Sequence, residues 1–441
     1  MRSLTRQLDA RLAAFKVLFA VETKGALSSG SLAEIEPKLS ERDRGLCHEI
    51  VLGTLRRQLE LDRIIDKLVA GKRLDMEVRI VLRLGLYQLR HLDRIPAHSA
   101  VNESVKLIRQ LKRSSAAGLV NAILRRYERE RTSPQPDDAI DRIVLETSHP
   151  RELIERWTAN FGRETAAAIA RANNEKPHLT FRAANRAVAA DRQLIEKYQR
   201  VEGVQGAAIA VRYDALLNRL ADEGKIYFQD AGSQLVANAI SLRDGGRFLD
   251  VCASPGSKCT AIAIRFPRHA IVAGDRSQRR TELLKNAAVS QRCRNIDIVR
   301  YDAERPLPFA AASFDVVLVD APCTGTGTIR HNPELRYRIT TDEIVRHSLR
   351  QLRILQNSSQ LVKENGLLIY STCSIEPEEN EGVAAEFLSN SREMQAVTLD
   401  IDARFRCDDG FYRTRPDRDD MDGFFIAGFQ RSKIIAEQVF S

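Results

Sequence analysis

Apolar residues recur at helical spacing through the first 132 residues. Val101, Val105 and Ile108, for example, follow the i, i+4, i+7 pattern of a helix with one apolar face. The same periodicity predicts helices over residues 9–21, 41–57, 75–91, 100–111 and 116–131. The N-terminal third is therefore predicted to be an all-helical domain.

From residue 246 onward, short apolar runs alternate with helical segments. Strands are predicted over residues 248–252, 270–274, 296–300, 314–319 and 367–370, and helices over 277–290 and 342–363. This alternation is typical of an α/β fold with a parallel, doubly wound sheet. Ligands bind beyond the carboxyl ends of such strands, so the residues just after each run are the candidates for chemistry.

Between these regions the pattern is mixed. Residues 132–138 have the Ser, Pro and Asp composition of a linker, and residues 140–235 combine helices with strands near 179–183 and 226–228. We therefore predict an all-helical domain (1–132), a small α+β module that serves as linker or RNA-binding part (140–235) and a Rossmann-like catalytic domain (236–433). The length of 441 residues suits about three domains of roughly 150 residues.

Charge is distributed unevenly between these parts. Residues 1–132 hold 26 Lys and Arg against 16 Asp and Glu, whereas the rest of the chain holds 42 against 43. A basic domain beside a neutral one suggests a polyanion such as RNA, although a solvated helical surface would look the same. No run approaches the ~20 apolar residues of a membrane span, and the N-terminus lacks a secretory pattern. Seven cysteines are too few for a disulfide scaffold, so we expect a cytoplasmic protein.

Acidic residues follow the first three predicted strands. The first strand opens into a loop from Asp250 to Lys258 that lacks the G-x-G-x-x-G of a dinucleotide site. Asp275 follows the second strand, where a carboxylate can accept both ribose hydroxyls, and Asp302 follows the third, where it can meet an adenine amino group. Each acid alone is equally a turn former or helix cap. Together they favour S-adenosyl-L-methionine, an adenosine without a diphosphate.

Cysteines follow the fourth and fifth strands, in 320–327 and 371–374. A lone cysteine after a strand is most often a small buried residue. Cys323 and Cys373, however, are expected to face the same crevice. A disulfide or half of a metal site is the alternative, but no C-x-x-C or flanking histidine supports zinc, so we expect no metal.

These motifs resemble those of the cytosine-5 RNA methyltransferase family. The resemblance lies in D-V-C-A-S-P-G-S-K (250–258), D-A-P-C-T-G-T-G (320–327), S-T-C-S (371–374) and the segments 229–234, 377–381 and 422–425. Residues 42–53 and 101–124 are similar to the antitermination factor NusB, an RNA-binding helical protein. The combination resembles the bacterial 16S ribosomal RNA methyltransferase B branch, also called Sun or Fmu, over nearly the whole chain.

The resemblance implies roles for individual residues. The cofactor-binding residues it implies are Cys252, Ala253, Ser254, Pro255, Gly256, Ser257, Lys258, Asp275, Asp302 and Asp320. It makes Cys373 the nucleophile and Cys323 the group that assists release, with Asp320 also catalytic. Ser254 stands where the family usually has alanine, so we expect a cofactor affinity different from that of relatives.

The expected chemistry requires a thiolate. C5 of cytosine is too electron-poor to attack a sulfonium methyl directly, and addition of a thiolate at C6 makes C5 nucleophilic. Asp320, protonated or sharing a proton near N3, would balance the charge that develops on the ring. The target base must leave its stack, so a loop cytosine of 16S RNA is the expected substrate of a monomeric enzyme.

Three other functions remain open at this stage. A transfer RNA substrate would use the same chemistry, and a non-catalytic RNA-binding assembly factor would use only the helical domain. A nucleotide-dependent oxidoreductase is disfavoured because the dinucleotide fingerprint is missing.

Overall fold

The computed structural model describes residues 8–131, 133–184, 197–210 and 215–432. Thr132 of the predicted linker lies outside the described residues. The chain forms two compact units. We call residues 1–175 with 329–338 the helical unit, and residues 176–328 with 339–441 the sheet unit.

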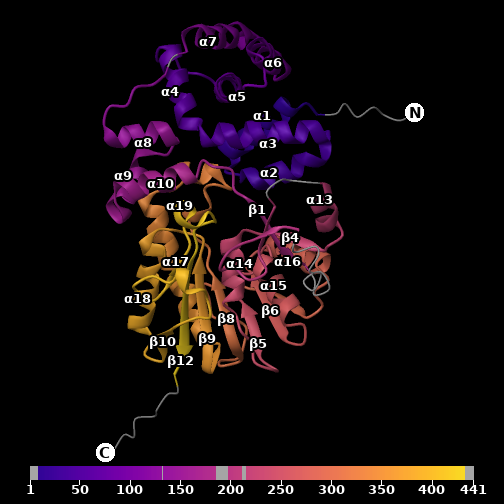
Figure 1. The fold of residues 1–441 in the computed structure, drawn as a ribbon, viewed down its shortest axis with the longest axis vertical. Helices are drawn as coiled ribbons and strands as arrows, with labels where there is room; N and C mark the ends of the chain where they lie inside the picture. Colours follow the sequence, from indigo (N-terminus) through magenta and orange to yellow (C-terminus); the bar gives the residue numbers. More distant parts are fainter. Residues whose placement is uncertain (1–7, 132, 185–196, 211–214, 433–441) are drawn as a thin grey trace, which may run out of the picture. The chain divides into compact units, whose positions relative to one another are not determined.

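The helical unit contains each of the five helices that the periodicity predicts (Figure 1). Its α-helices are α1 (Ala10–Lys24), α2 (Ser28–Ile35), α3 (Glu41–Arg56), α4 (Gln58–Val69), α5 (Met76–His91), α6 (Ala97–Gln110), α7 (Ala117–Glu130), α8 (Ala139–Thr147), α9 (Arg151–Phe161) and α10 (Arg163–Ala172). Helices α2 and α4 were not predicted. Helix α4 directly follows α3, and the chain turns between them at Arg57, whose ψ of 11° is not helical. A break of one residue leaves no gap in the apolar pattern, so α4 was not recognised as a separate helix.

A short segment from the second half of the sequence completes the helical unit. Residues 329–338 contain the 3₁₀ helix η4 (Pro333–Tyr337) and return to this unit. Arg336 is fully buried there and donates hydrogen bonds to the carbonyl of Thr147 (3.1 Å) and to Oδ1 of Asn174 (2.9 Å). A buried guanidinium needs such acceptors. This polar segment therefore lies inside the helical unit, although its neighbours in the sequence belong to the sheet unit.

The sheet unit contains two sheets. The small sheet has the strand order β2-β3-β1-β4 and the large sheet the order β10-β12-β9-β8-β5-β6-β7, with β11 paired to β12. The strands are β1 (Leu179–Ala183), β2 (Gln199–Arg200), β3 (Ala208–Ala210), β4 (Ile226–Phe228), β5 (Arg247–Asp250), β6 (Ala270–Asp275), β7 (Ile296–Arg300), β8 (Phe314–Asp320), β9 (Val362–Thr372), β10 (Met394–Val397), β11 (Tyr412–Arg413) and β12 (Phe425–Arg431).

The large sheet is mixed, whereas the alternation predicted a parallel one. Strands β5 to β9 pair in parallel, but β12 runs antiparallel to β9 and β10 antiparallel to β12. The five apolar runs behind the predicted strands do not include β10 and β12, the two antiparallel strands at one edge of the sheet. Antiparallel edge strands on otherwise parallel sheets are common.

Helices flank this sheet as the alternation requires. They are α14 (Ala231–Asn238), α15 (Ser257–Arg265), α16 (Gln278–Ser290), α17 (Thr341–Ser359) and α18 (Glu381–Asn390). Helix α13 (Ala215–Asp222) instead packs against β4 of the small sheet, and the short helix α19 (Pro416–Asp419) precedes β12. Helix α17 packs against β8 and β9, and α16 against β6 and β7. Helix α17 ends earlier than predicted because the chain enters β9 at Val362. The parallel strands place their carboxyl ends along one edge of the sheet.

The predicted module 140–235 is divided between the two units. Helices α8 to α10 belong to the helical unit, and strands β1 to β4 with α13 belong to the sheet unit. The division into three functional domains remains a prediction, because these compact units describe packing and not activity.

Candidate active site

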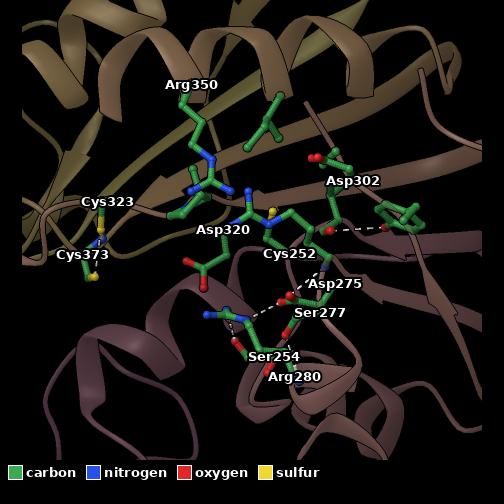
Figure 2. A pocket seen from close by; sticks show the side chains of 17 residues that line it. Cys252, Ser254, Asp275, Ser277, Arg280, Asp302, Asp320, Cys323, Arg350 and Cys373 are labelled. Atoms are coloured by element: carbon green, nitrogen blue, oxygen red, sulfur yellow. Dashed lines mark hydrogen bonds and ion pairs between the residues drawn. The ribbon is translucent and has the colours of Figure 1, made fainter. Parts of the chain in front are cut away.

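A cavity of about 350 Å³ lies at the carboxyl ends of β5 to β9 in the sheet unit (Figure 2). The predicted residues that line it are Cys252, Ser254, Asp275, Asp302, Asp320, Cys323 and Cys373. These residues lie up to 121 positions apart in the sequence and come from five successive strand ends. The cavity is therefore where a doubly wound sheet is expected to bind its ligand.

The other residues of the predicted cofactor loop do not line the cavity. Ala253, Pro255, Gly256, Ser257 and Lys258 are absent from its walls. At Gly256 the backbone is left-handed, with φ of +114°, and an added Cβ would lie 3.0 Å from side-chain atoms of α16. A residue with a side chain is strained in this conformation, so glycine lets the loop turn into α15 close to α16.

Asp275 lies at the end of β6 and is already hydrogen-bonded. Its Oδ2 accepts from Nε of Arg280 at 2.9 Å, and its Oδ1 accepts from the backbone N–H of Arg276 at 2.7 Å. Arg280 also donates to the carbonyl of Ser254 at 3.0 Å. Sequence reasoning missed Arg280, which joins the cofactor loop to the acid of the next strand. Its place five residues after Asp275, in the first turns of α16, was the available signal.

Asp302 follows β7 and combines two roles. Its Oδ1 accepts a hydrogen bond from the backbone N–H of Glu304 at 3.1 Å, which is the turn-forming role considered as its alternative. The residue nevertheless lines the cavity. Its local structural role and its position at the candidate site are therefore compatible.

Asp320, at the end of β8, is held by a cation and a hydroxyl. Nζ of Lys258 lies 2.7 Å from Oδ2, and Oγ of Ser371 donates to Oδ1 at 2.7 Å. Burial lowers the pKa of Lys258, but the charges of Asp320 and Cys373 outweigh burial and leave this pKa above its usual value. Lys258 is thus an ammonium group in a buried position, paired to the acid that follows the fourth strand.

The two predicted cysteines meet at the cavity. Sγ of Cys323 and Sγ of Cys373 are 3.0 Å apart, and both residues are free thiols. The backbone N–H of Cys373 also points to Sγ of Cys323 at 3.3 Å. The hydrogen bond with Cys373, then burial and the charges of Cys373 and Glu379, raise the pKa of Cys323 well above its usual value. Cys323 therefore holds its proton more firmly than an ordinary thiol.

Asp250 is buried directly behind the cofactor loop. It is 1% exposed, and neither carboxyl oxygen has a hydrogen-bond partner among the described residues. Burial, followed by the charge of Asp320, raises its pKa to about 8. This carboxyl is therefore mostly protonated at neutral pH. Such a shift next to a cavity is typical of functional sites.

Two further side chains of the cavity were not predicted. Arg350 points into it from α17 and pairs with Oε1 of Glu304 at 2.7 Å (Figure 2). Tyr301, after β7, donates its hydroxyl to the carbonyl of Val251 at 3.2 Å. Helix α17 carries five charged residues, and its sequence alone does not indicate which one turns inward.

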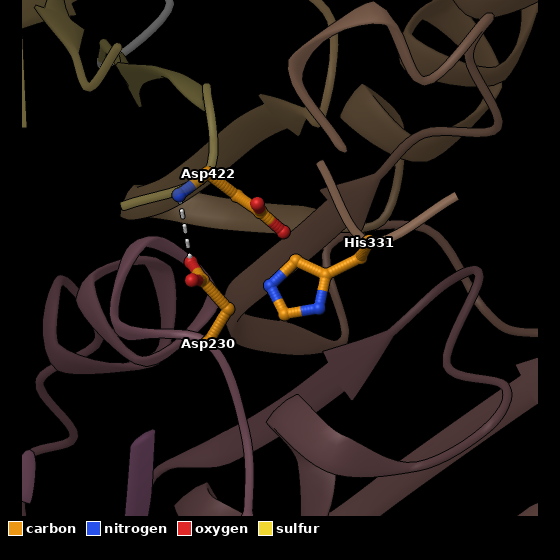
Figure 3. A group of neighbouring side chains, drawn as sticks. All are labelled: Asp230, His331 and Asp422. Atoms are coloured by element: carbon orange, nitrogen blue, oxygen red, sulfur yellow. Dashed lines mark hydrogen bonds between the residues drawn. The ribbon is translucent and has the colours of Figure 1, made fainter. Parts of the chain in front are cut away.

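Two of the family-like segments, 229–234 and 422–425, meet beside α14. Oδ1 of Asp230 caps this helix by accepting from the N–H of Gly232 at 2.7 Å, and it also accepts from the N–H of Asp422 at 3.3 Å (Figure 3). An added Cβ on Gly232 would lie 2.7 Å from Phe424. The close packing of the two segments requires glycine at this point.

No helix within the described residues is long and apolar enough to cross a membrane.

The fold and the cavity define the class of protein. The sheet unit has the Rossmann-like fold of class I S-adenosylmethionine-dependent methyltransferases. In solved structures the same fold occurs in PH0851, with a TM-score of 0.83, 24% identity, and coverage of 96% of this chain and 98% of that chain. It also occurs in a methyltransferase homolog protein from Pyrococcus horikoshii, with a TM-score of 0.57, 24% identity, and coverage of 67% and 99%.

Sequence relatives then give the family. The family model described as 16S rRNA methyltransferase RsmB/F matches residues 237–430, and the NusB family model matches residues 8–129. Ribosomal RNA small subunit methyltransferase B of Vibrio vulnificus is 31% identical over 95% of this chain and 99% of its own length. The protein of the same name from Pseudomonas putida is 32% identical over 90% and 93%.

The chain belongs to the ribosomal RNA small subunit methyltransferase B family. This confirms the resemblance, the predicted α/β fold class with a NusB-like helical domain, and S-adenosyl-L-methionine as the cofactor.

Proposed function

We propose that this protein transfers a methyl group from S-adenosyl-L-methionine to C5 of a cytosine in 16S ribosomal RNA, through a covalent adduct between Cys373 and C6. The observation that carries the proposal is the pair of free thiols, 3.0 Å apart, at a cavity lined by strand-end acids. A methyltransferase that acts on an oxygen or a nitrogen atom has no need of two thiols at this place.

The residues of the cavity fit the cofactor. Asp275 has two carboxylate oxygens for the two ribose hydroxyls, and Asp302 can accept from the adenine amino group. The loop from Cys252 to Lys258 encloses the same end of the sheet without the glycines that a diphosphate requires. When bound, S-adenosyl-L-methionine supplies an electrophilic methyl group.

The two cysteines have separate tasks in this proposal. The thiolate of Cys373 forms a bond to C6, which places electron density on C5, and N3 of the ring gains a proton. After C5 has been methylated, its proton leaves to a water hydrogen-bonded to Cys323, because the Cys323 thiol itself stays protonated. The C6–S bond then breaks, N3 returns its proton to the pair of Lys258 and Asp320, and Cys373 leaves as the thiolate, which restores the aromatic ring.

Lys258 and Asp320 provide the proton-sharing group that the chemistry needs near N3. Their ion pair of 2.7 Å holds a proton between an ammonium and a carboxylate at the base of the cavity. The sequence leaves two possibilities for Asp320 near N3, a protonated carboxyl or a carboxylate that shares a proton. The observed pair favours a shared proton, with Lys258 as its source.

The RNA is proposed to meet the basic part of the chain. The excess of Lys and Arg lies in residues 1–132, and phosphate contacts of such residues dominate RNA affinity. The target cytosine must be unstacked to reach the thiols, so it lies in a loop or single strand. We further propose that the protein acts as a monomer in the cytoplasm, which light scattering and cell fractionation test.

Bisulfite sequencing tests the proposal directly. Purified protein is incubated with S-adenosyl-L-methionine and either 16S RNA or bulk transfer RNA, and each product is sequenced. We expect a 5-methylcytosine at a discrete position of 16S RNA and none in transfer RNA. Modification of transfer RNA alone would favour the runner-up substrate, and binding of RNA without methylation would favour an assembly factor.

A further inference from the structure

A glutamate that the proposed reaction does not use lies behind the two thiols. Glu379 ends the 3₁₀ helix η5 (Pro377–Glu379) and is fully buried. Its Oε1 accepts from the backbone N–H of Thr324 (2.9 Å) and from Nε2 of Gln351 (3.0 Å). Its Oε2 accepts from the hydroxyls of Thr324 and Ser374, each at 2.5 Å. Four donors on two oxygens are what an ionised carboxylate needs when it is buried.

These hydrogen bonds join the two cysteine loops. Thr324 is the neighbour of Cys323 in the loop after β8, and Ser374 is the neighbour of Cys373 in the loop after β9. Gln351 adds a second link, because the same Nε2 also donates to the carbonyl of Pro322 at 3.0 Å. One carboxylate therefore links the two loops that carry the sulfur atoms.

The charges around the thiol pair are unequal. The hydrogen bond with Cys373 and burial raise the pKa of Cys323 most, and the carboxylate of Glu379 adds to them by disfavouring a thiolate at Cys323. The ammonium of Lys258 interacts favourably with a thiolate at Cys373. Two thiols in contact share one proton more readily than they lose two. With a negative group on one side and a positive group on the other, the proton is drawn to Cys323.

We propose that Glu379 is the positioning residue of the thiol pair: it sets the separation of Cys323 and Cys373, and its negative charge keeps the shared proton on Cys323, which leaves Cys373 as the nucleophile. This assignment rests on the proposed function for its catalytic consequence only. The charge asymmetry itself exists in the protein without RNA. The two cysteines, alike in composition, thus receive different roles from one buried carboxylate.

Thiol alkylation in the full-length protein tests the charge. Wild type, Glu379→Gln and Glu378→Gln are treated with iodoacetamide at pH 8 without RNA, and the rate at each cysteine is followed by peptide mass spectrometry. Glutamine keeps the size of the side chain, and the two hydroxyls can rotate to accept from its amide, so charge is the main change. Glu378 is exposed and serves as the matched control.

In wild type and Glu378→Gln, we expect Cys373 to react faster than Cys323. Glu379→Gln should speed alkylation of Cys323 about tenfold, which corresponds to one pKa unit. An unchanged ratio of the two rates in a folded Glu379→Gln would overturn the proposal. Glu379→Asp provides a second test if the glutamine variant does not fold. It keeps the charge but is one methylene shorter, so the preference for Cys373 should persist, and its loss would exclude the charge effect.

Kinetics distinguish this proposal from the proposed function. Glu379 does not line the cavity, so Glu379→Gln should lower kcat while the Kd for S-adenosyl-L-methionine and the KM for RNA stay within about twofold of wild type. A shifted alkylation ratio in an enzyme that never methylates cytosine would support Glu379 and reject the proposed function. If the wild-type protein methylates cytosine but Glu379→Gln leaves the ratio of the two alkylation rates unchanged, the proposed function is supported and the role of Glu379 is rejected.

Discussion

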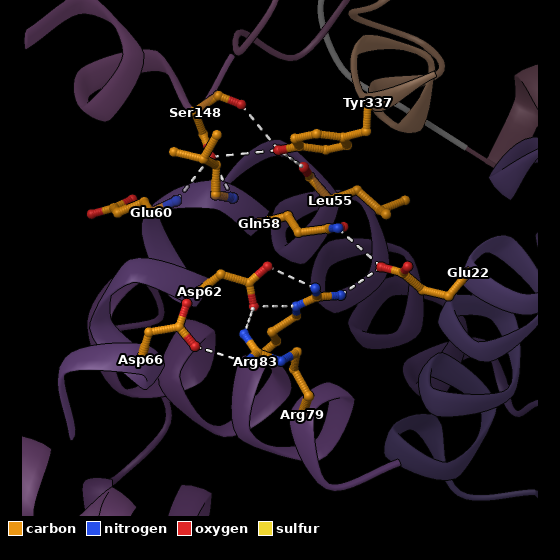
Figure 4. A network of polar contacts seen from close by, with 11 residues as sticks. Glu22, Leu55, Gln58, Glu60, Asp62, Asp66, Arg79, Arg83, Ser148 and Tyr337 are labelled. Carbon is orange, nitrogen blue, oxygen red and sulfur yellow. Dashed lines mark hydrogen bonds and ion pairs between the residues drawn. The ribbon is translucent and has the colours of Figure 1, made fainter. Parts of the chain in front are cut away.

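Two buried ionisable side chains, Arg83 in the helical unit and Asp250 in the sheet unit, have opposite surroundings. In the helical unit, Arg83 donates to both carboxylate oxygens of Asp62 at 2.8 and 2.7 Å and to Glu22 at 2.5 Å (Figure 4). Burial lowers the pKa of Arg83, but these acids outweigh it and raise the pKa above its usual value. In the sheet unit, Asp250 is as deeply buried but has no hydrogen-bond partner in the described part of the chain, and its pKa rises to about 8.

This difference separates structural from functional burial. Paired charges such as Arg83 and Asp62 favour one packing of the helices. Their hydrogen-bonding groups are already occupied by each other and are not free to bind a ligand. Asp250 and the thiol pair retain unused hydrogen-bonding or nucleophilic capacity next to a cavity. The free-energy cost of that arrangement is tolerated where a ligand or a reaction makes use of it. Substitutions in the two units should therefore fail in different ways.

The largest effect is expected at the two cysteines, and the two variants should differ. Cys373→Ala should lower methylation by at least ~1000-fold, because the nucleophile is lost, and should form no covalent RNA species. Cys323→Ala should still add to the base and accept the methyl group but should release product poorly. We expect a denaturant-resistant adduct on gels with that variant only, and at most about one turnover.

The double variant serves as the control, since no adduct can be trapped before it forms. It should behave as Cys373→Ala does. An adduct in Cys373→Ala and none in Cys323→Ala would mean that the two roles are exchanged, and adduct in neither variant would leave the covalent route unsupported.

The next largest effect concerns stability in the helical unit. Arg83→Met leaves Glu22 without its ion-pair partner and Asp62 with Arg79 alone, so it should lower the free energy of unfolding of this unit by roughly 1.5–3 kcal/mol, the contribution of hydrogen bonds to charged groups. Urea titration followed by circular dichroism measures the change. Lys106→Met is the matched control, because its pair with Glu103 on the surface is worth less than ~0.5 kcal/mol. Equal losses in both variants would remove the distinction between buried and exposed pairs.

At the cavity we expect a binding effect with little loss of stability. Asp275→Asn should raise the Kd for S-adenosyl-L-methionine about tenfold, because charge-assisted hydrogen bonds contribute roughly 1.5–3 kcal/mol. Titration calorimetry measures this affinity. Asp297→Asn on β7 is exposed and lies outside the cavity, so it should bind as wild type does. An unchanged affinity in Asp275→Asn would show that the ribose contact is misplaced.

The last prediction concerns Asp250, where the expected effect depends on pH. Its pKa of about 8 in the folded state lies above the usual 3.8, so the folded protein binds an extra proton between these values. The contribution of this carboxyl to stability is therefore fully present below pH 4 and is lost as the pH rises through 8. Asp250→Asn should melt at a higher temperature than wild type at pH 9 and should show a much smaller difference at pH 5. A constant difference would exclude the shift.

Much of the site could be predicted because it follows a local rule. Asp275, Asp302, Asp320, Cys323 and Cys373 each stand at or just after an apolar run, and parallel strands bring such positions to one edge. The periodicity of apolar residues likewise predicted that the N-terminal third is helical. Apolar residues three or four positions apart lie on one face of a helix, and the packing of helices buries that face.

Tertiary structure alone decided which polar residues turn inward. Arg280, Arg350 and Glu379 lie among many exposed charges of similar local pattern. The packing of α16 and α17 against the sheet, and of η5 against α17 and α18, directs them to the cavity or the thiols. Residues 329–338 complete the helical unit for the same reason: carbonyls from distant turns accept from Arg336, and no short-range signal encodes their meeting. A sequence specifies the spacing of apolar residues and the ends of strands directly. The hydrogen-bond partners of a buried charge come from distant parts of the chain, so only the folded structure decides them.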